Sequence, residues 1–275
     1  MKRILMTILM VALAASLILT GCSGQDESGT PAKAPDAAGS SNETEKMEKI
    51  VVGLDDNFPP MGFLDEKGEI IGFDIDMAKE AAKRMGVEVT FQPINWESNI
   101  LELNSKNIDL IWNGLTITPE RQKEISFTKP YLEDKQIIVV VKGSEIKGKT
   151  DLAGKIIGLQ AGSSSKDALE ADQETLKSLE DIVEYANNNE ALMDLKIGRT
   201  DAVVVDEVVG RYYIAKKPDE YVILEDNFGV QEFGVGLRKE DTELLNELQK
   251  VLDEMKEDGT SARISKEWFG EDIVK

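Results

Sequence analysis

The chain has 275 residues, of which 52 are acidic and 32 basic, and its formal net charge is −20. A protein this acidic repels nucleic acid and anionic lipid headgroups, so we expect the folded part to bind neither. The sequence has no histidine and one cysteine. This inventory excludes Ser-His-Asp and Cys-His catalysis and any zinc site built on those ligands, and we expect no metal and no cofactor.

The first residues have the pattern of a secretory signal. Lys2 and Arg3 precede an apolar run that ends in the string LTGC at Cys22. LTGC resembles a bacterial lipobox, which implies removal of residues 1–21 and a palmitate-bearing lipid on the sulfur of Cys22. The alternatives are a buried thiol after an ordinary signal, or an uncleaved anchor that is slightly short for a membrane span.

A polar, low-complexity segment follows this signal. Residues 22–47 are rich in glycine, serine, alanine, proline and acidic residues, and have almost no apolar side chains to bury. We therefore expect a flexible tether that begins at Cys22. The remaining chain is long enough for one large domain or two small ones.

From residue 50 onward, predicted strands and helices alternate. In the first half we expect strands at 50–54, 87–91 and 109–112, a hairpin around 65–68, a helix over 74–85 and a short helix from Trp96. This alternation predicts a parallel α/β sheet, in which ligands bind at the carboxyl ends of the strands. The loops after Leu54 and Trp112 are such ends.

The stretch 109–122 predicts an anion site. Thr118 and Pro119 have the order of a helix N-cap and a first helical residue, and Arg121 follows in the first turn. A cation there opposes the helix dipole, unless an anion lies nearby. A carboxylate ligand would meet both the free N–H groups of the helix and the guanidinium. The alternative is that Arg121 pairs with a surface acidic residue.

The second half repeats this plan. We expect strands at 136–142, 156–159, 182–185, 201–205, 221–224 and 233–237, and helices from Lys166, from Asn188, over 208–216, over 242–257 and from Ser261. The Gly-Ser loop 160–165 precedes a helix and is either a second backbone anion site or a plain helix cap. Residues 106–111 and 198–203 are weakly similar, which suggests two α/β lobes of like plan.

Six segments carry a resemblance to a known family: GLDDNFPPMGF (53–63), IIGFDIDMAKEAAKRMG (70–86), NIDLIWNGLTITPERQKEISFTKPY (107–131), GRTDAVVVDE (198–207), FGVGLRKED (233–241) and DGTSARISKEWFG (258–270). In this order they resemble the polar amino-acid-binding proteins of ABC importers, a group with lysine/arginine/ornithine-, histidine- and glutamine-binding members. The resemblance implies a two-lobe periplasmic-binding-protein fold with two crossing hinge strands. Lobe 1 would comprise residues 48–134 and 232–275, and lobe 2 residues 135–231.

The same resemblance implies how the charged end of an amino acid would be held. Arg121 would bind the α-carboxylate, helped by backbone N–H groups of Thr116 and Ser164. Asp206 would bind the α-ammonium group, together with the Thr116 hydroxyl and the Gly114 carbonyl. A zwitterion needs one fixed cation and one fixed anion, and closure of the two lobes would supply both contacts at once.

The ligand side chain would meet a second set of residues. Phe58 and Trp96 would sandwich it, Asp55 would contact its tip, and Gln160 would also reach the ligand. Asn113 stands where the family often has a smaller or hydroxylated residue, and replaces that contact with an amide. Phe58 and Trp96 are otherwise core aromatics, and Asp55 is otherwise a turn-capping residue. The acidic side chains at this end disfavour acidic ligands and favour a basic or amide tip.

The expected function is therefore that of an extracytoplasmic, lipid-anchored and monomeric substrate-binding subunit. It would capture a free polar amino acid and deliver it to an ABC permease and its ATPase, without catalysis. One rival is a dehydratase-type enzyme on the same fold, against which Asp206 argues because such a substrate has no ammonium group. The other rivals are a module that presents ligand to a membrane sensor, and a structural surface lipoprotein.

Overall fold

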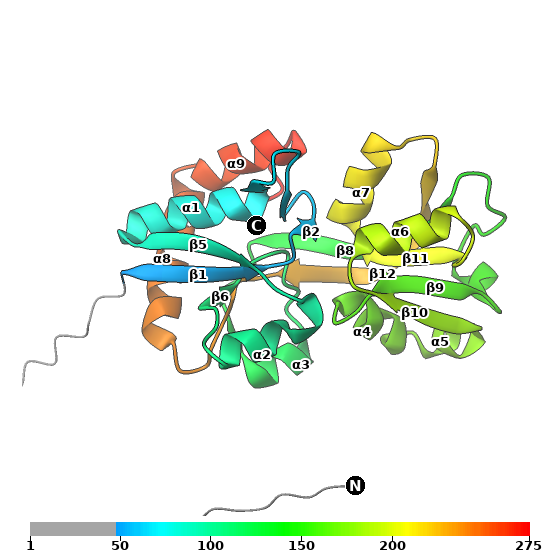
Figure 1. The fold of residues 1–275 in the computed structure, drawn as a ribbon, viewed down its shortest axis with the longest axis horizontal. Coiled ribbons are helices and arrows are strands. Elements are labelled where there is room, and N and C mark those ends of the chain that lie inside the picture. The colour runs from blue at the N-terminus through cyan, green and yellow to red at the C-terminus, as the bar shows by residue number, and fades with distance from the viewer. Residues whose placement is uncertain (1–47) are drawn as a thin grey trace, which may run out of the picture. The chain divides into compact units, whose positions relative to one another are not determined.

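The computed structural model of the chain describes residues 48–275. The predicted signal peptide, Cys22 and the predicted tether lie outside the described residues. Within 48–275, none of the helices has the length and hydrophobicity that a membrane crossing requires. The described residues build two five-stranded α/β sheets and a small three-stranded one (Figure 1).

The first large sheet has the parallel centre that the alternating pattern predicts. Its strand order is β5 (Glu88–Pro93), β1 (Lys49–Leu54), β6 (Leu110–Ile111), β13 (Gly236–Leu237) and β7 (Ser126–Phe127). β1 pairs in parallel with both β5 and β6, whereas β13 is antiparallel to its neighbours. The carboxyl ends of β1 and β6 therefore lie side by side, and the loops that follow them share one edge of the sheet.

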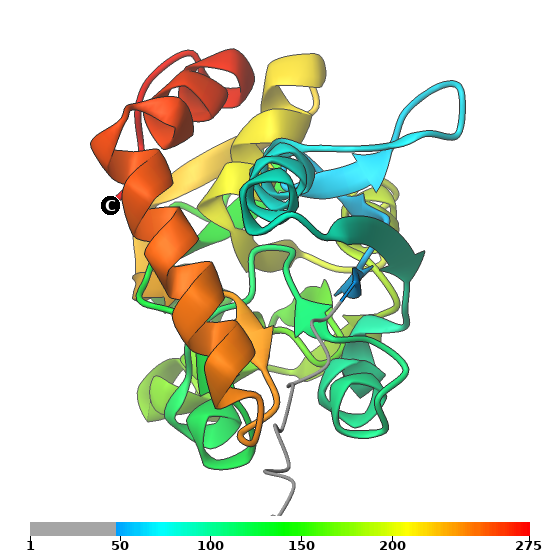
Figure 2. The same cartoon turned by 90° about the vertical axis from the view of Figure 1, so that its left-hand side faces the viewer.

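Helices cover both faces of this sheet. α1 (Phe73–Met85), α8 (Thr242–Glu257) and α9 (Thr260–Phe269) contact one another, and α2 (Asn99–Asn104) and α3 (Pro119–Glu124) lie on the face away from α1 and α9 (Figures 1 and 2). The apolar stripe predicted for α8 is buried, as an amphipathic helix requires: Leu244, Leu248, Val251, Leu252 and Met255. The small sheet follows β1 and consists of β2 (Asn57–Phe58), β3 (Gly62–Leu64) and β4 (Ile70–Ile71).

The second large sheet has the order β10 (Asp181–Tyr185), β9 (Ile156–Gln160), β11 (Ala202–Asp206), β8 (Leu132–Val141) and β12 (Tyr221–Phe233). β10, β9 and β11 are parallel, and every residue of β11 is buried, which suits a central strand. The helices of this half are α4 (Ser164–Ala171), α5 (Gln173–Ser178), α6 (Asn188–Lys196) and α7 (Glu207–Lys216), with short 3-10 turns at Lys149–Leu152 here and at Trp96–Ser98 in the first half.

The two longest strands differ from the sequence prediction. We expected strands at 136–142 and 221–224, but β8 begins at Leu132 and β12 continues to Phe233, where the two strands pair. Polar residues and two register shifts between Ile223 and Val230 interrupt the apolar pattern, so the sequence pattern predicts only the first part of β12. The expected strand at 233–237 is likewise wrong, because Phe233 ends β12 and only Gly236–Leu237 forms β13.

The Phe233 end of these strands reaches the first half of the molecule. Phe233 bridges to Thr116, and Leu132 bridges to Val274 near the C-terminus. The lobe boundaries expected from the resemblance, 134/135 and 231/232, fall inside β8 and β12, and they stay a prediction.

Candidate functional site

The predicted site residues lie at strand ends and in the loops that follow them. Asp55 follows β1 and Asn113 follows β6, while Gln160 and Asp206 are the last residues of β9 and β11. Hydrogen bonds link the loops of the first sheet to those of the second, so all ten residues belong to one region. All ten are buried: Asp55, Phe58, Trp96, Asn113, Gly114, Thr116, Arg121, Gln160, Ser164 and Asp206.

Arg121 lies in the first turn of α3, as its sequence context predicts. The Thr118 hydroxyl oxygen caps the helix by accepting from the Arg121 backbone N–H at 3.2 Å, and Pro119 is the first helical residue. The guanidinium donates from Nη1 to the Thr116 carbonyl and from Nη2 to the Gly162 carbonyl, both at 2.9 Å. Arg121 therefore joins a loop of the first sheet to a loop of the second.

This guanidinium has no carboxylate partner among residues 48–275, and only 7% of the residue is exposed. Burial lowers its pKa, against the opposing fields of Asp167 and Asp206. The alternative prediction, a surface ion pair of Arg121 with an acidic residue, is therefore wrong for the described residues. A buried cation that donates only to neutral carbonyls is poorly compensated, and an incoming carboxylate would stabilise it.

Hydroxyl and amide groups surround the Arg121 end of the site. The Thr116 and Ser164 hydroxyl groups lie 2.9 Å apart, and both contact the Gln231 side-chain oxygen, at 3.2 and 2.7 Å. The Gln136 amide nitrogen contacts the same oxygen at 3.1 Å. Sequence reasoning missed Gln136 and Gln231, which lie on β8 and β12. A glutamine directly before the apolar run Ile137–Val141 was the available signal.

Asp206 ends β11 with its side chain buried. Its Oδ1 accepts from the Gln136 amide at 2.6 Å. Burial raises the pKa of Asp206 to about 6, although Asp134, Gln136 and Arg121 act in the opposite direction. Sequence reasoning also missed Asp134, a second buried carboxyl group beside Asp206.

Phe58 and Trp96 face each other with nearly parallel rings. Their centroids are 6.4 Å apart at an interplanar angle of 13°, near the long end of the range for aromatic pairs. Phe58 also packs against Gly114, which has a left-handed φ of 59°. A Cβ on Gly114 would lie 2.7 Å from the Phe58 ring, so both the backbone conformation and the space require glycine there.

The opposite end of the site is closed by hydrogen bonds between side chains. Asp55 Oδ2 accepts from the Gln160 amide at 2.7 Å, and Gln160 in turn accepts from Asn188 at 3.0 Å. Asp55 Oδ1 caps the turn by accepting from the Asn57 N–H at 2.9 Å, so the turn-capping role is present as well. Asn113 accepts from the Asp55 backbone N–H at 3.1 Å. Burial is the main cause that raises the pKa of Asp55.

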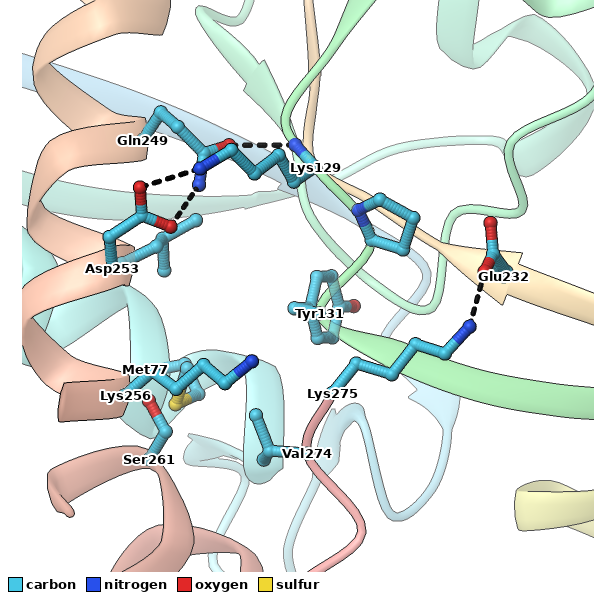
Figure 3. Close-up of a pocket in the computed structure, with 12 residues that line it drawn as sticks. Met77, Lys129, Tyr131, Glu232, Gln249, Asp253, Lys256, Ser261, Val274 and Lys275 are labelled. Atoms are coloured by element: carbon cyan, nitrogen blue, oxygen red, sulfur yellow. Dashed lines mark hydrogen bonds and ion pairs between the residues drawn. The ribbon is translucent and has the colours of Figure 1, made fainter.

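A separate surface pocket of about 250 Å³ shares none of these residues. Figure 3 shows Tyr131 and the lysines around it. Lys129 pairs with Asp253 at 2.8 Å, and Lys275 pairs with Glu133 at 3.2 Å and with Glu232. Two of its ammonium groups are therefore already neutralised by carboxylates.

The architecture of two α/β halves with buried charged side chains in the region between them is that of solute-binding proteins. The chain belongs to the bacterial extracellular solute-binding proteins, family 3, whose model matches residues 50–271. The family model thus covers both large sheets and all of the candidate site.

Named relatives support this assignment. The chain is 33% identical over 236 residues to the L-cystine-binding protein TcyJ of Escherichia coli K12, covering 85% of this chain and 87% of TcyJ. It is 36% identical to the ABC transporter arginine-binding protein 1 of the same organism, covering 81% of this chain and 91% of that protein. A solved structure of an ABC uptake transporter substrate-binding protein from Streptococcus pneumoniae, with bound histidine, has a TM-score of 0.80 and 38% identity over 82% of this chain and 94% of that one.

Proposed function

We propose that this protein captures one free α-amino acid between its two halves and delivers it to an ABC transporter. The observation that carries this function is the pair Arg121 and Asp206: two buried, opposite charges in one site, neither paired with a protein counter-ion within the described part of the chain. A zwitterion supplies both missing partners. The relatives bind cystine, arginine or histidine, which all carry this zwitterion.

Each end of the ligand would have its own contacts. The α-carboxylate would replace the Thr116 and Gly162 carbonyls on the Arg121 guanidinium, and would accept from the backbone N–H groups of Thr116 and Ser164. The α-ammonium group would donate to Asp206, to the Thr116 hydroxyl oxygen and to the Gly114 carbonyl. Such charge-assisted hydrogen bonds are worth roughly 1.5–3 kcal/mol each, more than bonds between neutral groups.

The ligand side chain would lie between Phe58 and Trp96 and end at Asp55 and Gln160. We propose a basic or amide side chain, because Asp55 repels an acidic tip and can accept from a guanidinium, ammonium or amide group. Such a tip would take the place of the Gln160 amide, which now donates to Asp55. Asn113, whose Nδ2 has no hydrogen-bond partner among residues 48–275, offers a further donor nearby.

Closure would couple these contacts. Hydrogen bonds that cross between the two halves include Arg121 to Gly162, Thr116 to Ser164, and Gln160 to Asp55. We propose that residues 48–134 with 232–275, and residues 135–231, move as two lobes about β8 and β12. A ligand that touches both lobes then favours the closed state by the contacts that only this state supplies.

We also propose the location and partners. Removal of residues 1–21 and a lipid on Cys22 would anchor the protein outside the cytoplasmic membrane, with 22–47 as the tether. The protein would act as a monomer that docks on the permease of an ABC transporter, whose ATPase drives uptake. Mass spectrometry of the membrane fraction tests this, because a lipid on Cys22 adds mass that Cys22→Ser removes.

A thermal-shift screen of the purified protein against the twenty amino acids, ornithine and cystine tests the main function. A ligand that binds only the folded state raises the unfolding midpoint by mass action, so the ranking reports specificity. We expect the largest shift with a basic or amide amino acid and none with aspartate or glutamate. No shift with any amino acid would refute the function, and turnover of a bound compound would favour an enzyme instead.

A further inference from the structure

Asp134, Gln136 and Asp206 lie on one face of the second sheet. Asp134 and Gln136 are two residues apart on β8, and side chains with that spacing on a strand share a face. Asp206 stands opposite Gln136 in the antiparallel pair of β8 and β11, and the Gln136 amide donates to its carboxylate at 2.6 Å. Diagonal neighbours of this kind are within reach of each other's side chains. The carboxyl groups of Asp134 and Asp206 are thus adjacent.

The first turn of α7 holds the second carboxyl group in place. Asp134 accepts from the backbone N–H groups of Glu207 at 3.2 Å and Val208 at 3.1 Å, the two residues directly after Asp206. Asp134 and Asp206 are each 3% exposed. Among residues 48–275, neither carboxyl group has a Lys or Arg partner within ion-pair distance, so only hydrogen bonds compensate their burial.

The charged groups around the pair do not neutralise it. Arg121 acts on Asp206 only through space, because its N–H groups donate to the Thr116 and Gly162 carbonyls. The neighbouring cations form ion pairs with Glu207 instead: Arg211 at 2.5 Å and Lys135 at 3.8 Å. The pocket of about 580 Å³ that Asp134 lines contains the same Arg211 and Glu207, and adds two further acids, Glu133 and Glu271.

Two buried carboxylates side by side cannot both ionise at low cost. Burial, followed by the field of Asp206, raises the pKa of Asp134 well above its usual range, and burial raises the pKa of Asp206 to about 6. Such neighbours titrate as one unit, and the first proton added is shared between them. An ammonium group between the two would favour loss of that proton.

We propose, on the basis of the function above, that Asp134 and Asp206 together form the ammonium site, hold one shared proton before binding, and release it when the ligand's ammonium group arrives. The carboxyl O–H bond breaks and the proton passes to a buffer base. The ligand keeps all three ammonium protons and donates them to the carboxylates and to their neighbours. Asp134 is then a ligand-binding residue as well as an anchor for α7.

The sign of the pH dependence follows from this release. Because the bound complex holds fewer protons than the free protein and ligand, affinity rises with pH while the pair still carries its proton. The dependence flattens at pH values above those at which the free protein loses it. At most about tenfold in affinity per pH unit is expected, the limit for one released proton.

Calorimetry with L-arginine and L-glutamine at pH 6.5, in phosphate and in imidazole, tests the carboxyl pair. These buffers differ in ionisation enthalpy, so the difference in observed heat counts the protons released. We expect between about half a proton and one proton per ligand bound. Equal heat in the two buffers overturns the carboxyl pair but leaves the proposed function standing. No heat with either ligand, together with no shift in the thermal screen, overturns both.

Asp134→Asn and Glu133→Gln form a matched pair of variants. The side-chain amide that replaces the Asp134 carboxyl group can still accept a backbone hydrogen bond but cannot share a proton. The released proton count should therefore fall by at least half while binding persists. Glu133 is the exposed neighbour that pairs with Lys275, and Glu133→Gln should leave the count unchanged. An unchanged count in Asp134→Asn contradicts the pair. If that variant does not fold, the wild-type comparison between buffers decides alone.

Discussion

The two ends of the candidate site are built differently. At the Arg121 end, charged groups are buried and meet neutral partners, the Thr116 and Gly162 carbonyls and the Gln136 amide. At the Asp55 end, side chains satisfy one another through Gln160 and Asn188. The charged groups of the first end lack counter-ions, and the carboxylate and ammonium groups of any α-amino acid would supply them. At the Asp55 end, a ligand must replace an existing hydrogen bond, so we expect this end to favour only a side chain that carries a suitable donor.

Replacing the cation should have the largest effect. Arg121→Ala leaves the ligand carboxylate without its counter-ion in a buried site, a loss of about 3–5 kcal/mol that corresponds to at least a hundredfold in affinity. The loss should be similar for every amino acid that binds, because all share the carboxylate. Calorimetry measures it, and circular dichroism checks the fold. Retained micromolar affinity would remove Arg121 from the carboxylate site.

A change in the loop between the two ends should have the next largest effect. Gly114→Ala places a Cβ 2.7 Å from the Phe58 ring in a backbone with φ of 59°, at a cost of roughly 1–3 kcal/mol. Affinity should fall for all ligands, since this loop also carries Thr116. Chemical denaturation and calorimetry measure the two losses. The matched control is Gly143→Ala, whose φ is also positive but whose Cβ meets no atom within 4 Å, and which should lower stability without changing affinity.

The Asp55 end should change ligand ranking more than overall affinity. Asp55→Asn removes the negative charge and keeps one of the two carboxylate oxygens, so the turn-capping bond from the Asn57 N–H can remain. Basic ligands should lose about 1–2 kcal/mol relative to glutamine, the size expected for a charge-assisted bond replaced by a neutral one. Competition between arginine and glutamine measures the ratio. A uniform loss across ligands would contradict the role of Asp55 at the side-chain tip.

The smallest effect is expected outside both ends. Lys129→Ala breaks an exposed ion pair with Asp253 in the pocket of Figure 3. Such pairs contribute about 0–1 kcal/mol, and the site residues do not contact this pocket. Ligand affinity and ranking should therefore stay unchanged. A clear loss of affinity would show that the pocket is coupled to the site.

The sequence was informative where the chemistry is local. Thr118, Pro119 and Arg121 lie within four residues of one another, so a capped helix could be predicted from the local sequence. The structure has that helix at Pro119–Glu124. The parallel centres of both sheets followed from alternating strands and helices. The prediction of Phe58, Trp96 and Asp206 as site residues came from the family resemblance, and their ligand contacts stay a prediction.

Residues on the long strands could not be found in this way. Gln136 and Gln231 are separated by 95 positions, yet the Gln136 amide donates to the Gln231 oxygen at 3.1 Å. A polar residue in a strand usually faces solvent. Only the pairing of β8 with β12 and β11 shows that Gln136 is buried and that the half-buried Gln231 lies next to it. The same holds for Asp134, whose partners are backbone N–H groups of residues 207 and 208.

The main chain, through the Thr116 and Gly162 carbonyls, decides where the Arg121 guanidinium rests. A backbone carbonyl is present whatever side chain a residue bears. Substitutions around Arg121 can therefore alter the shape and polarity of the site without removing the two backbone acceptors of the guanidinium. The Asp55 end relies instead on an aspartate, a glutamine and two asparagines, each of which a single base change can replace. If Arg121 binds the ligand carboxylate as proposed, descendants of one such gene could exchange one amino acid for another while that contact persists.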